Sequence, residues 1–120
     1  MTQLIDTNIL IKRLKEKKPV EGKISVKTLI EMLRGTPETK RGKLKKTIEE
    51  GFTIVEITND VILEYCKLYD RLKEKGQLMN DADLLLAASA KASGIPLITS
   101  DKGFKRLENL GVSIIIEESD

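Results

Sequence analysis

The sequence predicts an α/β fold of three layers, in which helices cover both faces of an open parallel sheet of four or five strands. Short apolar stretches rich in Val and Ile alternate along the chain with longer segments whose apolar residues recur at helical spacing. The short stretches are continuously apolar, which is typical of strands buried on both faces. No dipeptide typical of a tight hairpin separates them, so neighbouring strands are expected to run parallel.

Two strand–helix units are expected in residues 2–35. Residues 2–5 predict a strand, and Asp6 at its end can cap the helix that follows. A second short strand is expected at residues 23–24, after which Ser25 caps a helix that ends at Gly35. The residues expected on the apolar faces are Ile9, Leu10, Ile11 and Leu14 in the first helix, and Val26, Leu29, Ile30 and Leu33 in the second.

The middle of the chain predicts a polar helix, a strand and a long amphipathic helix. Thr36 and Pro37 are expected at the cap and first turn of the polar helix, which stops at Gly51. Residues 52–57 have the β-branched composition of a strand. Thr58 caps the long helix, whose apolar side chains recur at helical spacing in Val61, Tyr65, Leu68, Tyr69 and Leu72.

The last third of the chain predicts a buried helix and two further strands. Residues 84–90 are apolar almost all round, which is typical of a helix buried on more than one side. Residues 96–99 predict a strand, Asp101 opens a short helix, and residues 112–116 predict the last strand. No linker, repeat or low-complexity stretch interrupts this pattern, so residues 1–120 are expected to form a single domain.

Two missing residue types limit the chemistry. The chain has no histidine, which excludes Ser-His-Asp and Cys-His nucleophiles and imidazole-bound zinc. Cys66 is the only cysteine, so neither an intrachain disulfide nor a Cys-rich metal site can form. An acid at position 6 precedes any apolar signal region, and no apolar run is long enough to span a bilayer. We therefore expect a cytoplasmic protein without a membrane attachment.

Two aspartates follow predicted strands near the point where each strand ends. Asp6 comes directly after residues 2–5, and Asp101 comes shortly after residues 96–99. Open parallel sheets bind their ligands outside the carboxyl ends of the strands, so both side chains are expected at the same functional edge. Each aspartate also has an ordinary alternative role as a helix N-cap, which is worth about 1 kcal/mol.

Three further acids lie on predicted helices. Asp83 stands at the start of a nearly all-apolar helix, so we expect it either to interact with the helix dipole or to face a polar cavity. Asp81, two residues earlier, is the more natural cap. Glu31 lies off the apolar face of its helix, where solvated glutamates are common, so its position alone favours a surface role.

Acids that converge on one pocket need a cation. Two carboxylates 4 Å apart repel by about 4 kcal/mol at the effective dielectric of a protein cleft. Mg²⁺ or Mn²⁺ suits an all-oxygen set of ligands, acidifies a water nucleophile and binds phosphoryl oxygens. Phosphodiester hydrolysis is therefore the chemistry expected of such a pocket in a chain without histidine.

Four acidic segments follow one another along the chain. Leu4–Leu10 is an apolar strand ending in Asp, followed by Thr and another polar residue, and Ser25–Gly35 places Ser before a helix that carries Glu31. Asp83–Ala90 is an alanine-rich helix headed by Asp, and Thr99–Phe104 is Thr-x-Asp followed by an aromatic residue. In order and spacing, across residues 2–116, these segments resemble the four motifs of the PIN domain family, and within it those of the small VapC-type toxin ribonucleases.

The resemblance implies a metal-dependent endoribonuclease that attacks phosphodiesters of single-stranded RNA. It implies four catalytic acids, Asp6, Glu31, Asp83 and Asp101, of which Asp6, Asp83 and Asp101 hold one or two Mg²⁺ or Mn²⁺ ions. It also implies polar supports, Asn8 and Thr99, and leaves open that Asp81 replaces or assists Asp83. A homodimer and a small antitoxin that blocks the acidic pocket are implied as partners.

Positive charge is concentrated in the first third of the chain. Residues 12–46 hold 13 Lys and Arg against 4 acids, whereas the other residues hold 8 against 15. Such a stretch can bind the RNA backbone, although lysines that only solvate two exposed helices would produce the same count. The candidate phosphate contacts are Lys12 and Arg13 in the first helix, and Lys40, Arg41, Lys43, Lys45 and Lys46 in the third.

Two other classes of protein share parts of this pattern. A phosphoacceptor receiver domain has a similar length, alternation and acidic pocket, but it resembles a pattern with an acceptor Asp after the third strand and a Lys after the fifth. Residues 54–58 and 113–117 supply neither. The other alternative is a catalytically silent PIN-like scaffold that binds RNA or protein, and the presence of all four acids argues against it.

Overall fold

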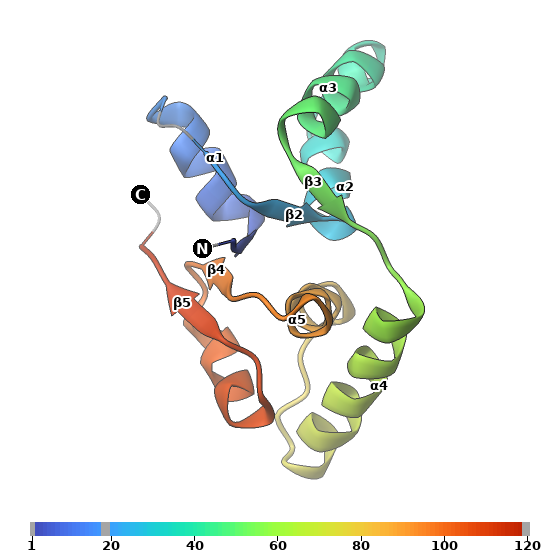
Figure 1. Cartoon of the computed structure of the whole chain (residues 1–120), viewed down its shortest axis with the longest axis vertical. Coiled ribbons are helices and arrows are strands. Elements are labelled where there is room, and N and C mark those ends of the chain that lie inside the picture. Colours follow the sequence, from blue (N-terminus) through green and yellow to red (C-terminus); the bar gives the residue numbers. More distant parts are fainter. Residues whose placement is uncertain (1, 18–19, 119–120) are drawn as a thin grey trace.

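The computed structural model describes residues 2–17 and 20–118, and within them five parallel strands form one sheet (Figure 1). The strand order is β3-β2-β1-β4-β5, with β1 at the centre. All of the strands are short: β1 spans Leu4–Ile5, β2 Lys23–Ser25, β3 Thr53–Val55, β4 Leu97–Thr99 and β5 Ile114–Ile116. The open parallel sheet expected from the sequence is confirmed.

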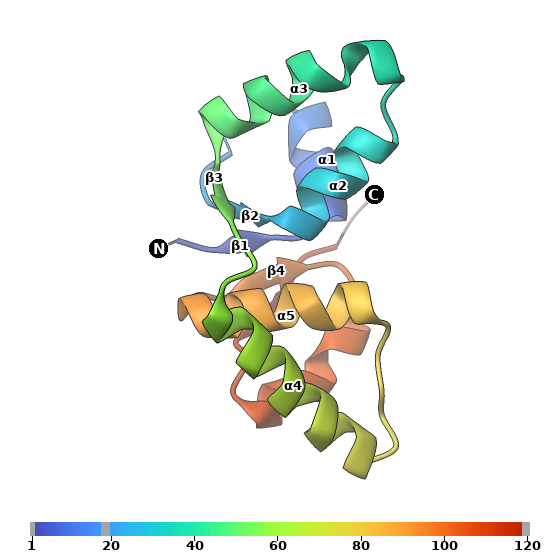
Figure 2. The ribbon, with the colours of Figure 1, turned by 90° about the vertical axis from the view of Figure 1, so that its right-hand side faces the viewer.

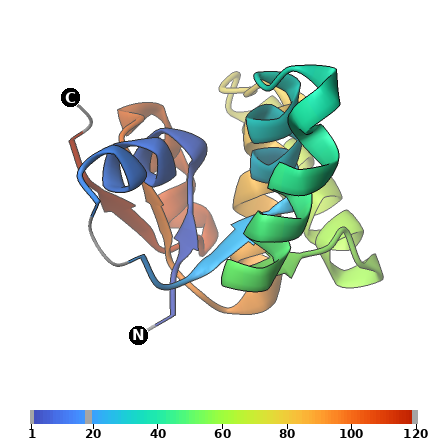
Figure 3. The ribbon, with the colours of Figure 1, turned by 90° about the horizontal axis from the view of Figure 1, so that it is seen from above.

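Helices cover both faces of the sheet (Figure 2). One face carries α1 (Thr7–Lys15), α2 (Val26–Arg34) and α3 (Glu38–Gly51), and the other carries α4 (Asn59–Glu74), α5 (Asp81–Ser93) and the 3₁₀ helix η1 (Lys102–Leu110). On the first face, α1 lies beside β4, whereas α2 and α3 lie beside β2 and β3 (Figure 3). In the described part of the chain, every helix is too short or too polar to cross a membrane.

Side chains of the two central strands alternate between two apolar cores. Leu4 of β1 and Leu97 of β4 point into the core shared with α4, α5 and η1, whereas Ile5 and Ile98 point into the core shared with α1, α2 and α3. Successive side chains of a strand face opposite sides of the sheet, so each strand is held by packing from both layers. The residues directly after β1 and β4 therefore start from rigidly placed strand ends.

The helix α5 lies between the sheet and α4, as its apolar sequence predicts (Figure 2). Leu84, Leu86 and three alanines of this helix are fully buried. Alanine side chains are small, so α4 and the sheet can both pack closely against the helix. This double packing holds Asp83, in the first turn of α5, at a defined position beside the sheet edge.

The strand order produces a reversal at the carboxyl ends of β1 and β4. From β1 the chain continues to β2 on one side, and from β4 it continues to β5 on the other side. Open α/β sheets bind ligands in the crevice at such a reversal. The same order excludes the receiver-domain alternative, because that fold places β1 between β2 and β3.

Two predicted caps are wrong. The Thr36 hydroxyl donates to the Met32 carbonyl at the end of α2 (2.9 Å), and α3 has no side-chain cap. At α5 the cap is Asn80 and not Asp81, because the Asn80 amide oxygen accepts a hydrogen bond from the Asp83 backbone N–H (2.9 Å). The Thr36 side chain bonds to a backbone carbonyl instead of capping α3, and the Asp81 side chain bonds to the Tyr65 hydroxyl of α4.

Three apolar residues expected to be buried are exposed, and Leu14 of α1 is one of them, at 47%. Ile30 is 55% exposed, because it lies about 100° around α2 from Leu29, which faces the core. Ile57 is 45% exposed, because β3 ends at Val55 and the chain leaves the sheet before reaching it. The Ile30 and Ile57 side chains are left beside the acidic edge described below.

Candidate functional site

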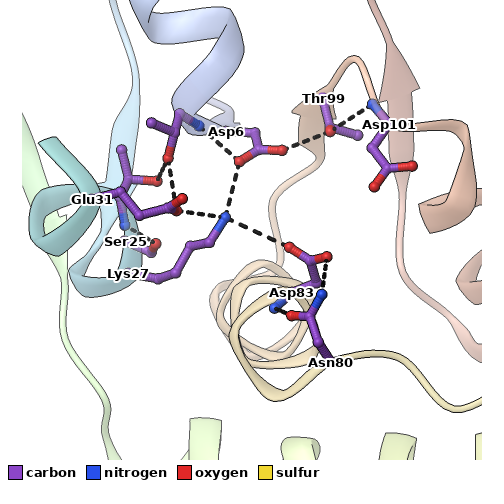
Figure 4. A network of polar contacts seen from close by, with 10 residues as sticks. Asp6, Ser25, Lys27, Glu31, Asn80, Asp83, Thr99 and Asp101 are labelled. Carbon is purple, nitrogen blue, oxygen red and sulfur yellow. Dashed lines mark hydrogen bonds and ion pairs between the residues drawn. The ribbon is translucent and has the colours of Figure 1, made fainter. Parts of the chain in front are cut away.

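Asp6 is the centre of a polar network at the carboxyl end of β1 (Figure 4). Its side chain caps α1 by accepting from the Thr7 backbone N–H (2.7 Å), and its other oxygen accepts from the Thr99 hydroxyl of β4 (2.7 Å). Asp6 is only 6% exposed. Asp6 therefore acts as a helix N-cap and also lies at the edge of the sheet where the predicted site is expected.

Thr99 joins Asp6 to Asp101. Its hydroxyl donates to Asp6 and also accepts from the Asp101 backbone N–H (3.1 Å), so one buried side chain positions both acids. The Asp101 carboxylate caps η1 through one oxygen, which accepts from the Gly103 N–H (2.8 Å). Asp101 is exposed, and its second oxygen accepts no hydrogen bond from the described residues, which leaves that oxygen able to bind a ligand.

Glu31 faces the acidic edge and not bulk solvent. The Thr7 hydroxyl lies 3.1 Å from the Glu31 Oε1 and 3.2 Å from the Thr28 hydroxyl, which links α1 to α2. Ser25 begins α2 by accepting from the Thr28 N–H, and this sets the rotation of the helix that carries Glu31. Glu31 is therefore not a freely solvated surface residue: its side chain is 29% exposed and is held by the Thr7 hydroxyl of α1.

Lys27 is the site residue that the sequence analysis missed. Its ammonium nitrogen lies 2.7 Å from Glu31 Oε1, 3.4 Å from Asp6 Oδ1 and 3.6 Å from Asp83 Oδ1 (Figure 4). Burial lowers the pKa of this ammonium, but the hydrogen bond to Glu31 and the charges of all three acids outweigh burial and raise it. The available signal was the spacing of Lys27 and Glu31 by one helical turn directly after a predicted strand.

Asp83 and Asp81 face different partners. Asp83 points one oxygen toward Lys27, and its other oxygen accepts from the Asn80 side-chain amide (2.8 Å). Asp81 instead accepts a hydrogen bond from the Tyr65 hydroxyl of α4, and this bond raises the pKa of Tyr65 to about 12. The two acids are two residues apart on a helix, so they point in nearly opposite directions. The geometry brings Asp83 into the network and leaves Asp81 outside it.

The donor set suits a hard divalent cation. Asp6, Glu31, Asp83 and Asp101 offer only carboxylate oxygens, which Mg²⁺ and Mn²⁺ prefer. Within residues 2–17 and 20–118, however, no three His, Cys, Asp or Glu side chains are gathered closely enough to hold a metal ion. Three of the four acids are instead arranged around the Lys27 ammonium. The chemistry of the donors fits a metal, and a protein cation occupies the space between them.

The remaining predicted residues lie away from this network. Asn8 is exposed on α1, and its side chain makes no hydrogen bond to any described residue, so its supporting role stays a prediction. Both Lys12 and Arg13 form ion pairs with Glu117, after β5. On α3, Arg41 donates to the Leu33 carbonyl in the last turn of α2 and to the Thr36 carbonyl between the two helices. The exposed residues Lys40 and Lys43 are paired with no described carboxylate.

Comparison with known proteins agrees with the fold and the motifs. The family described as PIN domain matches residues 4–110, which include all four acids. Ribonuclease VapC1 of Methanocaldococcus jannaschii is 36% identical in an alignment of 115 residues that covers 92% of this chain and 85% of that protein.

Two solved structures are similar across almost the whole chain. VapBC-1 from nontypeable Haemophilus influenzae has a TM-score of 0.80 and 22% identity, over 97% of this chain and 98% of that chain. VapBC2 from Rickettsia felis, bound to a DNA fragment from its promoter, has a TM-score of 0.78 and 23% identity, over 98% of this chain and 100% of that chain. At these identities the two structures support the fold.

Replacing Thr99 by Val should destabilise the protein. The change keeps the size and branching of the side chain but removes the hydroxyl, which donates to buried Asp6 and accepts from the Asp101 N–H. The free energy of unfolding should therefore fall by about 1–3 kcal/mol. Urea denaturation in chelator measures this. Thr47→Val, which removes an exposed hydroxyl on α3, should change stability by no more than about 0.5 kcal/mol. Equal effects of the two substitutions would contradict the bridging role of Thr99.

Proposed function

The chain belongs to the PIN domain family, and from this premise we propose that it is a metal-dependent endoribonuclease acting on single-stranded RNA. One observation carries the proposal. Acids from segments far apart in the sequence meet at one edge of the sheet, where Asp6, Glu31 and Asp83 share one cation and Asp101 joins them through Thr99. The 36% identity to a protein named as a ribonuclease supports the same activity.

Under this proposal Asp6, Asp83 and Asp101 would hold Mg²⁺ or Mn²⁺, with Glu31 assisting. When bound, such an ion neutralises phosphoryl oxygens and lowers the pKa of a water molecule. The protein's own contribution is to hold the acids in place: Thr99 and the Thr7 N–H orient Asp6, and Asn80 orients Asp83. With no histidine in the chain, a carboxylate of this edge is the group placed to accept a proton.

The basic stretch would bind the RNA backbone mainly through α3. Lys40 and Lys43 are exposed and have no carboxylate partner among the described residues, so phosphate can reach them without displacing an ion pair. Lys12 and Arg13 would have to exchange Glu117 for phosphate. Most aromatic side chains are at least partly buried, and Phe104 fully so, which favours backbone contact over base stacking.

An antitoxin would cover the apolar groove beside the acids. This groove, of about 250 Å³, is lined by Val26, Lys27, Ile30, Glu31, Arg34, Ile57, Ala82 and Leu85. It shares Lys27 and Glu31 with the acidic network, so a partner segment seated there would lie against the site. Similar chains occur in VapBC structures, which supports a protein partner and a toxin role here. A homodimer and a cytoplasmic location remain part of the proposal.

Asp83→Asn and Asp81→Asn form a matched pair that tests the proposal. With Mn²⁺ and a mixed single-stranded RNA pool, Asp83→Asn should lower the cleavage rate by more than about a hundredfold. Loss of a ligand should exceed the 10–100-fold cost of losing a ligand's hydrogen-bond partner. Asp81→Asn should cleave at close to the wild-type rate, because Asp81 contacts Tyr65 and not the network.

Controls separate the proposal from its alternative. Chelator should abolish cleavage by the wild-type protein. Cleavage that survives chelation or the Asp83→Asn substitution would refute the metal-dependent activity. RNA binding without cleavage under every metal condition would instead establish the catalytically silent scaffold.

Salt dependence tests the RNA surface. Each phosphate contact with a single strand contributes about 0.7 to the slope of log K against log salt concentration. The double variant Lys40→Gln/Lys43→Gln should therefore reduce that slope by about 1.4, as measured by fluorescence anisotropy in chelator. Lys73→Gln/Lys75→Gln, at the end of α4, removes the same charge from the opposite end of the molecule and should leave the slope close to wild type. Equal slopes for the two double variants would argue against α3 as the RNA surface.

A further inference from the structure

Lys27 is the only Lys or Arg side chain within ion-pair distance of the acidic network among the described residues. Its side chain is 12% exposed, and it reaches from α2 between β1 and α5 (Figure 4). Its contact to Glu31 at 2.7 Å is much shorter than those to Asp6 (3.4 Å) and Asp83 (3.6 Å). The ammonium is therefore bound firmly to its own helix and loosely to the two acids across the crevice.

The oxygens that Lys27 faces are the ones that a metal ion would need. The Oδ2 of Asp6 accepts from the Thr99 hydroxyl, and the Oδ2 of Asp83 accepts from the Asn80 amide. The Oδ1 of each points toward Lys27, and the Oδ1 of Asp6 also accepts from the Thr7 N–H (2.7 Å). A divalent cation and an ammonium group at these two atoms would repel each other and compete for the same lone pairs.

We propose that Lys27 is an internal counter-ion of the metal-free site, and that a divalent cation binds by displacing its ammonium from Asp6 and Asp83. The proposal rests on the metal-dependent function above. Displacement requires little movement, because the two long contacts break while the short contact to Glu31 is kept. The flexible four-carbon stem of lysine permits this swing. Glu31 is then the carboxylate that retains Lys27, and Asp6, Asp83 and Asp101 are left to the metal.

Displacement has two opposite consequences for a variant without the charge. In the metal-free protein, removal of the ammonium leaves the acids unneutralised and the fold less stable. In the presence of metal, the same removal abolishes a competitor, so the ion binds more tightly. A lysine that only supports the fold would show the first effect without the second.

Mn²⁺ titration by calorimetry tests the proposal on the full chain. Lys27→Met, of similar length but neutral, should lower the Kd for Mn²⁺ by about tenfold or more, equivalent to about 1.4 kcal/mol. Its Tm in chelator should fall below that of the wild type, and saturating Mn²⁺ should close this gap. Lys91→Met is the matched control, because it removes a comparable ion pair, to Glu64 at 2.8 Å, outside the acidic network, and should leave the Kd unchanged.

The outcomes distinguish this proposal from the proposed function. If the wild-type protein binds Mn²⁺ and Lys27→Met has an unchanged or higher Kd, displacement is refuted. The proposed metal-dependent function is not contradicted by that result. Absence of Mn²⁺ binding by every protein refutes both. If Lys27→Met does not fold, Lys27→Gln replaces it in the Mn²⁺ titration and is judged by the same criteria. Lys27→Arg keeps the charge and should keep a Kd near that of the wild type.

Discussion

Repulsion between carboxylates is the constraint that the carboxyl edge of this sheet has to satisfy. Two such charges 4 Å apart repel by about 4 kcal/mol at the effective dielectric of a cleft. Asp6 is nearly buried, so water cannot screen its charge, and its oxygens instead meet the Thr7 N–H, the Thr99 hydroxyl and the Lys27 ammonium. Glu31 and Asp83 form ion pairs with the same Lys27 ammonium. The polar contacts between α1, α2, α5 and β4 at this edge are therefore mostly ion pairs and hydrogen bonds made to these acids.

The fold makes this concentration of charge attainable. The two apolar cores hold the ends of β1 and β4 side by side, and the burial of α5 brings Asp83 opposite α2. Ordinary local devices then complete the site: Asp6, Asp101 and Asn80 are all N-caps. Each of these caps satisfies a backbone donor with one side-chain oxygen and leaves its second polar atom for another contact. Helix capping and the polar network at this edge therefore use the same side chains.

Most of the fold was predictable because its elements have clear apolar periods, and Asp6 and Asp101 were predictable because they follow strands. Glu31 was not identifiable from periodicity, since residue spacing on α2 does not reveal that Thr7 of α1 and Lys27 contact its side chain. The choice between Asp81 and Asp83 required the position of Tyr65 on α4. Lys27 was hidden among many lysines, and only tertiary structure shows which of them faces the acids. The exposure of Ile30 and Ile57 likewise depends on where the sheet ends.

Exchange of a protein cation for a metal ion at this acidic edge can be observed by anomalous diffraction from crystals of the wild-type protein grown with and without Mn²⁺. The Mn²⁺ crystals should show an anomalous peak adjoining the carboxylates of Asp6 and Asp83, with the Lys27 ammonium withdrawn from both and still bound to Glu31. An anomalous peak elsewhere, or Lys27 unmoved between Asp6 and Asp83 at saturating Mn²⁺, would contradict this exchange.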